Sequence, residues 1–300
     1  MTKISDVFRG SDGKLRPIFR ALLYAVLAFW LLSADWLVGP VLQRTAVSLG
    51  LTGLSPGRDA FYETVNLLTA LLLTWGFALY EGRRVDSYGL PVGDAFGKRF
   101  REGFAIGVVN VGAVALAMLA FGGMTIHGLA LHGTTLLWAT LAWFGSNILV
   151  GIAEEYLFRG YLLQTLWRSV GFWPAAAIIA LWFGADHYFF KQGENAQDLI
   201  LLVSVGLWLC YSVRRTGTLW LAAGYHAAFD FMQLFVIGTP NGSIEPVHHL
   251  LNVSFQGPAW ISGGALGVEA SFFEFPLIAL MFFYLWRRRF VERSQSPPLN

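Results

Sequence analysis

Long apolar segments separated by short polar ones dominate the sequence. A membrane-spanning helix needs about 20 mostly apolar residues, and eight segments come close to that length. This pattern predicts an all-α fold, a polytopic membrane helical bundle with about eight transmembrane helices, in which residues 1–300 form a single integral membrane domain. The sixth segment is short, so seven spans is the alternative. The eight predicted spans are 18–42, 61–80, 104–121, 136–157, 174–190, 199–213, 219–237 and 272–286.

The composition supports this interpretation. Hydrophobic residues make up 55% of the chain and charged residues only 13%, and the mean hydropathy is +0.54. A disordered chain needs the opposite balance, and a soluble globule needs more polar surface. The net charge of +2 does not argue for binding to nucleic acid. The single cysteine, Cys210, excludes an internal disulfide framework and a cysteine-based zinc site.

The positions of the basic residues predict an orientation. If both termini are cytoplasmic, 18 of the 21 Lys and Arg residues lie in cytoplasmic segments, and the outer loops keep only Arg44, Arg58 and Lys191. Positive charge is enriched on the cytoplasmic side of membrane proteins. The distribution favours eight spans, because seven would place the Arg-rich C-terminal segment outside. The length and the lack of trafficking signals are typical of a bacterial inner-membrane protein.

Two connecting segments differ from the rest. Residues 238–267 carry no Lys or Arg and are expected to form an extracytoplasmic loop, re-entrant in part around Phe255 to Ile261. The polar tail at 294–300 is expected to be flexible.

Ionisable side chains within apolar spans are costly and indicate function. The fourth span ends in Glu154 and Glu155, followed by Arg159. Glu155 and Arg159 are four residues apart and can form an ion pair on one helix face. Glu154 points about 100° away, which leaves it free for chemistry.

Three further candidates lie on the fifth and seventh spans. His187 is in the fifth, and His226 and Asp230 are four residues apart in the seventh, so they share a helix face. At about 1.5 Å per residue, these three and Glu154 lie about 16 to 22 Å from the cytoplasmic boundary. They are therefore expected to meet at one level.

A carboxylate near two imidazoles suits two kinds of site. Glu154, His187, His226 and Asp230 could bind a divalent metal such as zinc, which leaves a coordination position for water. Alternatively, Glu154 and one histidine could activate water directly, while the other histidine and Asp230 stabilise the oxyanion. The remaining acidic residues of the spans are expected to be isolated packing or interfacial residues; they are Asp35, Glu63, Asp186 and Glu274.

These motifs together resemble a known family. Glu154-Glu155-x-x-x-Arg159, Phe183-x-x-x-His187 and His226-x-x-x-Asp230 are similar, in this order, to the three motifs of the CPBP family, also called Abi. This family comprises CAAX prenyl endopeptidases and bacteriocin-processing or bacteriocin-immunity proteins. The resemblance covers a motif core of about residues 148–232. Many relatives have Asn where this chain has Asp230, which favours a metal-ligand role or a protonated carboxyl group there.

The resemblance implies an intramembrane endopeptidase, of the metalloprotease or the glutamate type. By position, Glu154 resembles the water-activating glutamate with His187 as its partner, and His226 and Asp230 resemble the second pair. Glu155, Arg159 and Phe183 would support them. The implied partners are the lipid bilayer and a peptide or membrane-protein substrate, with or without lipidation.

Two other functions remain open. One is a non-proteolytic scaffold or immunity protein on the same fold, with the polar cluster retained for packing. The other is a small-solute transporter that uses its membrane glutamate and histidines.

Overall fold

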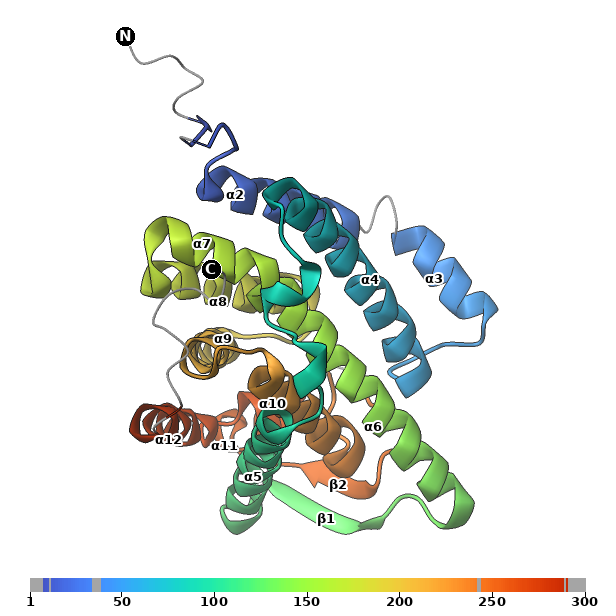
Figure 1. Ribbon diagram of the computed structural model, residues 1–300. Helices are drawn as coiled ribbons and strands as arrows, with labels where there is room; N and C mark the ends of the chain where they lie inside the picture. Colours follow the sequence, from blue (N-terminus) through green and yellow to red (C-terminus); the bar gives the residue numbers. More distant parts are fainter. Residues whose placement is uncertain (1–7, 11, 34–38, 242–243, 289, 291–300) are drawn as a thin grey trace.

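The computed structural model describes residues 8–10, 12–33, 39–241, 244–288 and 290. Within this part the chain is a bundle of helices, as predicted, to which one two-stranded sheet is added (Figure 1). The predicted tail at 294–300, Asp35 and the basic residues Lys3, Arg289 and Arg293 lie outside the described residues. The elements, with η for π and 3₁₀ segments, are α2 Pro17–Ala28, η1 Phe29–Ser33, α3 Gly39–Ser48, α4 Pro56–Glu81, η2 Val85–Tyr88, η3 Val92–Asp94, α5 Lys98–Ala120, β1 Met124–Leu129, α6 Gly133–Glu155, η4 Tyr156–Leu162, α7 Leu163–Val170, α8 Phe172–Phe190, α9 Ala196–Thr216, α10 Trp220–Asp230, η5 Phe231–Ile237, β2 Leu251–Phe255, α11 Ala259–Ser262, η6 Gly264–Ala270 and α12 Glu274–Arg287.

Five helical segments among the described residues are long and apolar enough to cross a membrane. They include α4, α5, the continuous run from α6 to α7, α9, and the run from η6 to α12. The helix α8 and the run α10–η5 match two further predicted spans but fall outside this set. The helix α8 carries His187, and the run α10–η5 carries His226 and Asp230.

The first predicted span, 18–42, corresponds to α2, η1 and the start of α3. Residues 34–38 lie outside the described residues, so the single continuous helix stays a prediction. Pro40 lies in the first turn of α3, where proline is tolerated because the first backbone N–H groups of a helix have no acceptor within it.

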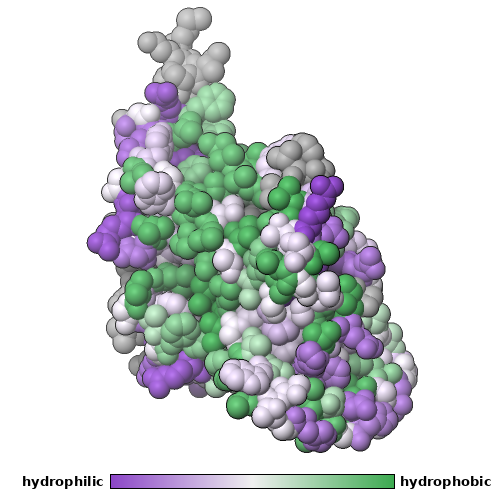
Figure 2. Space-filling model, turned by 90° about the vertical axis from the view of Figure 1, so that its right-hand side faces the viewer, coloured by the Kyte–Doolittle hydropathy of each residue, from purple (hydrophilic) through white to green (hydrophobic). Residues whose placement is uncertain are grey.

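Exposed apolar side chains cover the outer helix faces. On α4, Leu68, Leu72, Trp75 and Leu79 form one exposed stripe, with three- and four-residue spacing. Figure 2 shows a face of the molecule on which hydrophobic residues cover most of the middle, with hydrophilic residues toward its margins. Large apolar patches of this kind are rare on soluble monomers, so this surface fits an integral membrane protein.

Glycines let α10 pack unusually close to both α5 and α6. A Cβ atom at Gly107 of α5 would lie 2.6 Å from the carbonyl oxygen of Tyr225. A Cβ atom at Gly151 of α6 would lie 2.6 Å from the carbonyl oxygen of Ala223 and 2.8 Å from the nitrogen of Ala227. Small residues allow this close backbone approach in membrane helices. The contacts fix α10 between its two neighbours (Figure 1).

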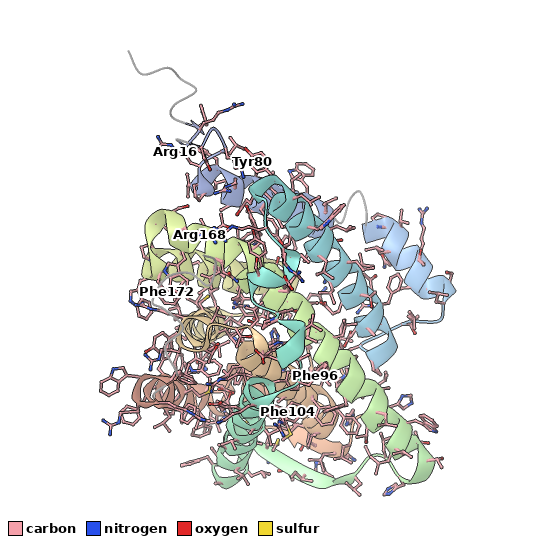
Figure 3. The ribbon with its side chains drawn as sticks, in the orientation of Figure 1. Arg16, Tyr80, Phe96, Phe104, Arg168 and Phe172 are labelled. Atoms are coloured by element: carbon pink, nitrogen blue, oxygen red, sulfur yellow. The ribbon has the colours of Figure 1, made fainter. Side chains whose placement is uncertain are left out.

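Glu81, a buried glutamate, connects several helices at the C-terminal end of α4. Glu81 accepts a hydrogen bond of 2.6 Å from the Tyr161 hydroxyl and pairs with Arg20 at 3.0 Å. Arg168 lies 3.8 Å from the same carboxylate. Arg168 and Tyr80, the residue before Glu81, are labelled in Figure 3. The cluster joins α2, α4 and the α6–α7 run at the end that the sequence predicts to be cytoplasmic.

A two-stranded antiparallel sheet joins two loops that the sequence places on the outer side. β1 follows α5, and β2 lies in the long 238–267 loop, with Met124 opposite Phe255. The residues expected to be re-entrant form the end of β2 and the short helix α11. The sheet was not predicted, although β2 (LNVSF) alternates between apolar and polar residues and β1 (MTIHGL) begins with the same alternation, because both strands are short and lie in connecting segments.

We expect Gly151→Ala to lower the free energy of unfolding by about 1 to 3 kcal/mol, because the new methyl group meets backbone atoms of α10 that cannot rotate away. Gly145→Ala on the same helix is the matched control, since a Cβ atom there has no neighbour within 4 Å. Thermal unfolding of the purified variants in one detergent checks this. Equal melting temperatures for the two variants would contradict it.

Candidate active site

The candidate residues of the three motifs lie around one cavity. Glu154 comes from α6, His187 from α8, and His226 and Asp230 from α10. All four line a cavity of about 260 Å³. The structure therefore brings together side chains that are up to 76 positions apart in the sequence. Their catalytic roles remain predictions.

Both polar motifs that end a helix are followed by a π-helical segment. Glu154 and Glu155 are the last two residues of α6, and η4 begins at the next position. Asp230 is the last residue of α10, and η5 follows it. π segments are rare and occur frequently at functional sites, because the wider turn changes the direction of side chains.

Glu155 holds His226 as well as Arg159. Its Oε1 accepts a hydrogen bond of 3.1 Å from Arg159, which confirms the predicted ion pair, and one of 3.0 Å from Nδ1 of His226. The Glu155 and Arg159 side chains are fully buried. The sequence predicted the pairing of Glu155 with Arg159, and the family resemblance implied a supporting role for both residues. In the structure this carboxylate also fixes the orientation of the His226 ring.

The other ring nitrogen of His226 lies between two carboxylates. Its Nε2 is 3.7 Å from Oε2 of Glu154 and 3.6 Å from Oδ2 of Asp230. A proton on Nε2 therefore has an acceptor on either side. Glu154 and Asp230 are both connected to the same imidazole, although they lie on different helices.

His187 is held differently. Its Nδ1 donates a hydrogen bond of 2.9 Å to the carbonyl oxygen of Phe183, and the neutral ring then has Nε2 as its acceptor. The Phe183 ring lies 4.5 Å from the His187 ring and 6.3 Å from the His226 ring, between centroids. The Arg159 guanidinium lies 4.5 Å above the Phe183 ring. Phe183 thus contacts both histidines and the buried arginine.

The sequence analysis missed part of the cavity wall. Glu63 and Glu274 were expected to be isolated packing or interfacial residues, but both line the cavity. Asp59 and Glu269 line it too, and the sequence analysis did not single them out. The one available signal was the four-residue spacing of Asp59 and Glu63 within an apolar helix.

Asp186 lies elsewhere, although it precedes His187. It lines a second cavity of about 130 Å³, together with Asn66, Phe158 and Trp182. Glu154 lines this cavity as well. Glu154 therefore borders both cavities.

The loop after α8 adds charged groups next to the main cavity. Burial opposes the charge of Lys191, but Glu269 and other carboxylates raise its pKa. Burial, followed by the charge of Glu269, raises the pKa of Glu194 to about 7. Glu194 therefore titrates in the neutral range, whereas Lys191 stays charged there.

The described residues offer no obvious metal site. Among them, no three His, Cys, Asp or Glu side chains lie in an arrangement that could hold a metal ion. The four candidates therefore do not form a ready ligand set, and a bound zinc ion remains a prediction.

The comparisons with known proteins agree with the motifs. Residues 136–232 match the model of the family described as Rce1-like, type II CAAX prenyl endopeptidase. The match covers less than half of the chain and includes all four candidate residues. It confirms the resemblance drawn from the motifs. No curated protein and no solved structure matches the chain significantly.

We expect Glu155→Gln to lower the free energy of unfolding by about 3 kcal/mol, because it leaves the buried Arg159 charge without a carboxylate. The matched control is Asp86→Asn, which removes the carboxylate of an exposed ion pair with Arg84 and should leave the melting temperature unchanged. A similar loss in both variants would contradict the structural role of Glu155.

The pH dependence of stability should depend on Glu194. Because its pKa is raised in the folded state, its contribution is fully favourable below about pH 4.5 and is lost as the pH rises to about 7. We expect the melting temperature of Glu194→Gln to fall less than that of the wild type between pH 5 and pH 8. The same decrease in both proteins would exclude this group as the cause.

Proposed function

We propose that this chain, which belongs to the CAAX prenyl endopeptidase family through the motif segment 136–232, hydrolyses a peptide bond within or beside the membrane. The observation that carries the proposal is the meeting of Glu154, His187, His226 and Asp230 around one cavity in an otherwise apolar bundle. Buried ionisable groups of membrane helices are costly to keep without a function.

Water activation follows from the acceptor atoms. The Glu154 carboxylate and Nε2 of His187 are both acceptors, so one water between them can donate a hydrogen bond to each and direct a lone pair at the substrate carbonyl. Glu154 takes one proton as the water oxygen attacks. It then gives this proton to the leaving amide nitrogen, which yields an amine and a new carboxyl group.

The second pair stabilises the charge that develops on the carbonyl oxygen. Nδ1 of His226 donates to Glu155, so Nε2 carries a proton for the oxyanion when the ring is in its imidazolium form, between the carboxylates of Glu154 and Asp230. A protonated Asp230 would be a second donor. Glu155, Arg159 and Phe183 act as positioning residues, because they contact the two histidines or each other.

The family indicates a membrane-associated peptide as substrate. We propose either a peptide precursor or a segment of a membrane protein, with lipidation as a further option. If a divalent metal is bound, the same four side chains would be its ligands, and it would polarise the attacking water. The mechanism above uses only the side chains of the chain.

We expect Glu154→Gln to lower the cleavage rate by at least about 100-fold, because the amide cannot accept the proton of water. The measurement compares protein termini in cells that express the wild type or the variant at equal levels in the membrane. Glu245→Gln, in an exposed part of the 238–267 loop, is the matched control and should give the termini of the wild type.

Two outcomes would contradict the proposal. Identical termini in all three strains would exclude a Glu154-dependent endopeptidase and favour the scaffold or immunity function. Solute flux that depends on Glu154, without new termini, would favour a transporter.

A further inference from the structure

The wall of the main cavity carries an excess of acidic groups. Six carboxylates line it, whereas Lys191 and Arg58 are its only lysine and arginine among the described residues. The six are Asp59, Glu63, Glu154, Asp230, Glu269 and Glu274. Uncompensated charge is expensive away from water, so this cavity is suited to a cationic group.

Two of these carboxylates share an arrangement that the proposed mechanism does not use. Glu269 in η6 is 8% exposed and Glu274 in α12 is 2% exposed. Oε2 of Glu269 accepts a hydrogen bond of 3.3 Å from the Gln233 amide, and Oε2 of Glu274 accepts one of 2.9 Å from the Asn110 amide. Oε1 of each glutamate is buried without a hydrogen-bond partner.

The side-chain amides of Asn110 and Gln233 make further hydrogen bonds that fix their orientation. Oδ1 of Asn110 accepts a hydrogen bond of 2.7 Å from the Tyr225 hydroxyl, which directs its NH₂ group at Glu274. The NH₂ group of Gln233 also donates to Oδ1 of Asp230 at 3.3 Å. Because amides are neutral, these contacts orient the carboxylates without compensating their charge.

No lysine, arginine or histidine of the described residues forms a close ion pair with these two glutamates. None of the ion pairs within 4.0 Å includes Glu269 or Glu274. Lys191 lines the same cavity and interacts with Glu269 at longer range. The two free oxygens therefore remain available to a donor from outside the chain.

We propose that Glu269 and Glu274 form a subsite for a basic side chain, lysine or arginine, of the peptide substrate. This rests on the proposed endopeptidase function and names a feature of its substrate. The ammonium or guanidinium group would donate to Oε1 of the two glutamates, and the apolar stem would pack against cavity-lining residues such as Ile278 and Leu209.

The position of the subsite relates the basic residue to the cleaved bond. Gln233 contacts both Glu269 and Asp230, and Tyr225, which contacts Asn110, directly precedes His226. The subsite is therefore one side chain away from the proposed oxyanion-binding pair. The basic residue should lie within a few positions of the cleaved bond, and a substrate carboxylate at this place would be repelled.

The test separates binding from catalysis. The probe is a fluorescent membrane-spanning polyleucine peptide that carries a single lysine, and its partner probe has glutamine at that position. Both probes are titrated against the Glu154→Gln protein in lipid nanodiscs. This variant is used because it should not cleave the probes. We expect the lysine probe to bind at least about tenfold more tightly than the glutamine probe.

Further variants assign the preference to the two glutamates. Glu269→Gln and Glu274→Gln, each added to Glu154→Gln, should remove most of the preference for lysine and leave the affinity of the glutamine probe unchanged. Glu194→Gln removes a carboxylate of the loop after α8, outside the lining of the main cavity, and should keep the preference. Melting temperatures verify that each variant is folded, and Glu274→Asp, which retains the charge, should restore part of the preference.

The outcomes distinguish the two proposals. Equal affinity of the two probes, no binding of either, or a preference that survives both glutamine variants would overturn the basic subsite. A lysine preference that depends on Glu269 and Glu274, together with no Glu154-dependent termini in cells, would support the subsite and overturn the endopeptidase function.

Discussion

The close backbone contact between α10 and its two neighbours is the constraint on which the site depends. Gly107 and Gly151 leave room for α10 to pack directly against α5 and α6. This places His226 within 3.0 Å of Glu155 and within 3.7 Å of Glu154. A short hydrogen bond between two helices requires such an approach, because neither side chain is long enough to bridge helices separated by large residues. Small residues in these helices thus set the geometry of the polar ones.

The buried charged groups next to the site share hydrogen-bond partners. Glu155 accepts hydrogen bonds from Arg159 and His226 with one oxygen, and the Arg159 guanidinium lies over the ring of Phe183. Phe183 in turn contacts the His187 ring. The residues behind the proposed catalytic groups therefore form one connected set, in which each ionised or aromatic group supports the next. At the C-terminal end of α4, the Glu81 carboxylate likewise pairs with both Arg20 and Arg168.

The sequence was sufficient for the helices and for the central residues of the site. Apolar segments of membrane-spanning length located most spans, and four-residue spacings identified the Glu155–Arg159 pair and the shared face of His226 and Asp230. It was not sufficient for Glu63, Glu269 and Glu274. Glu269 and Glu274 are each the single acidic residue of their element, and Glu63 shares α4 with Asp59 and Glu81; only the tertiary structure brings these three glutamates to one cavity. The sheet escaped prediction because its two strands are separated by more than a hundred residues and join loops.

The sheet has a mechanical consequence. β1 continues from α5, and β2 leads through α11 into η6, which carries Glu269. α5 also packs closely against the backbone of α10 at its glycines. One helix is thereby connected to α10, which carries His226 and Asp230, and through the sheet to η6, which carries Glu269. Membrane helices can tilt relative to the bilayer, and a tilt of α5 would act on both elements at once.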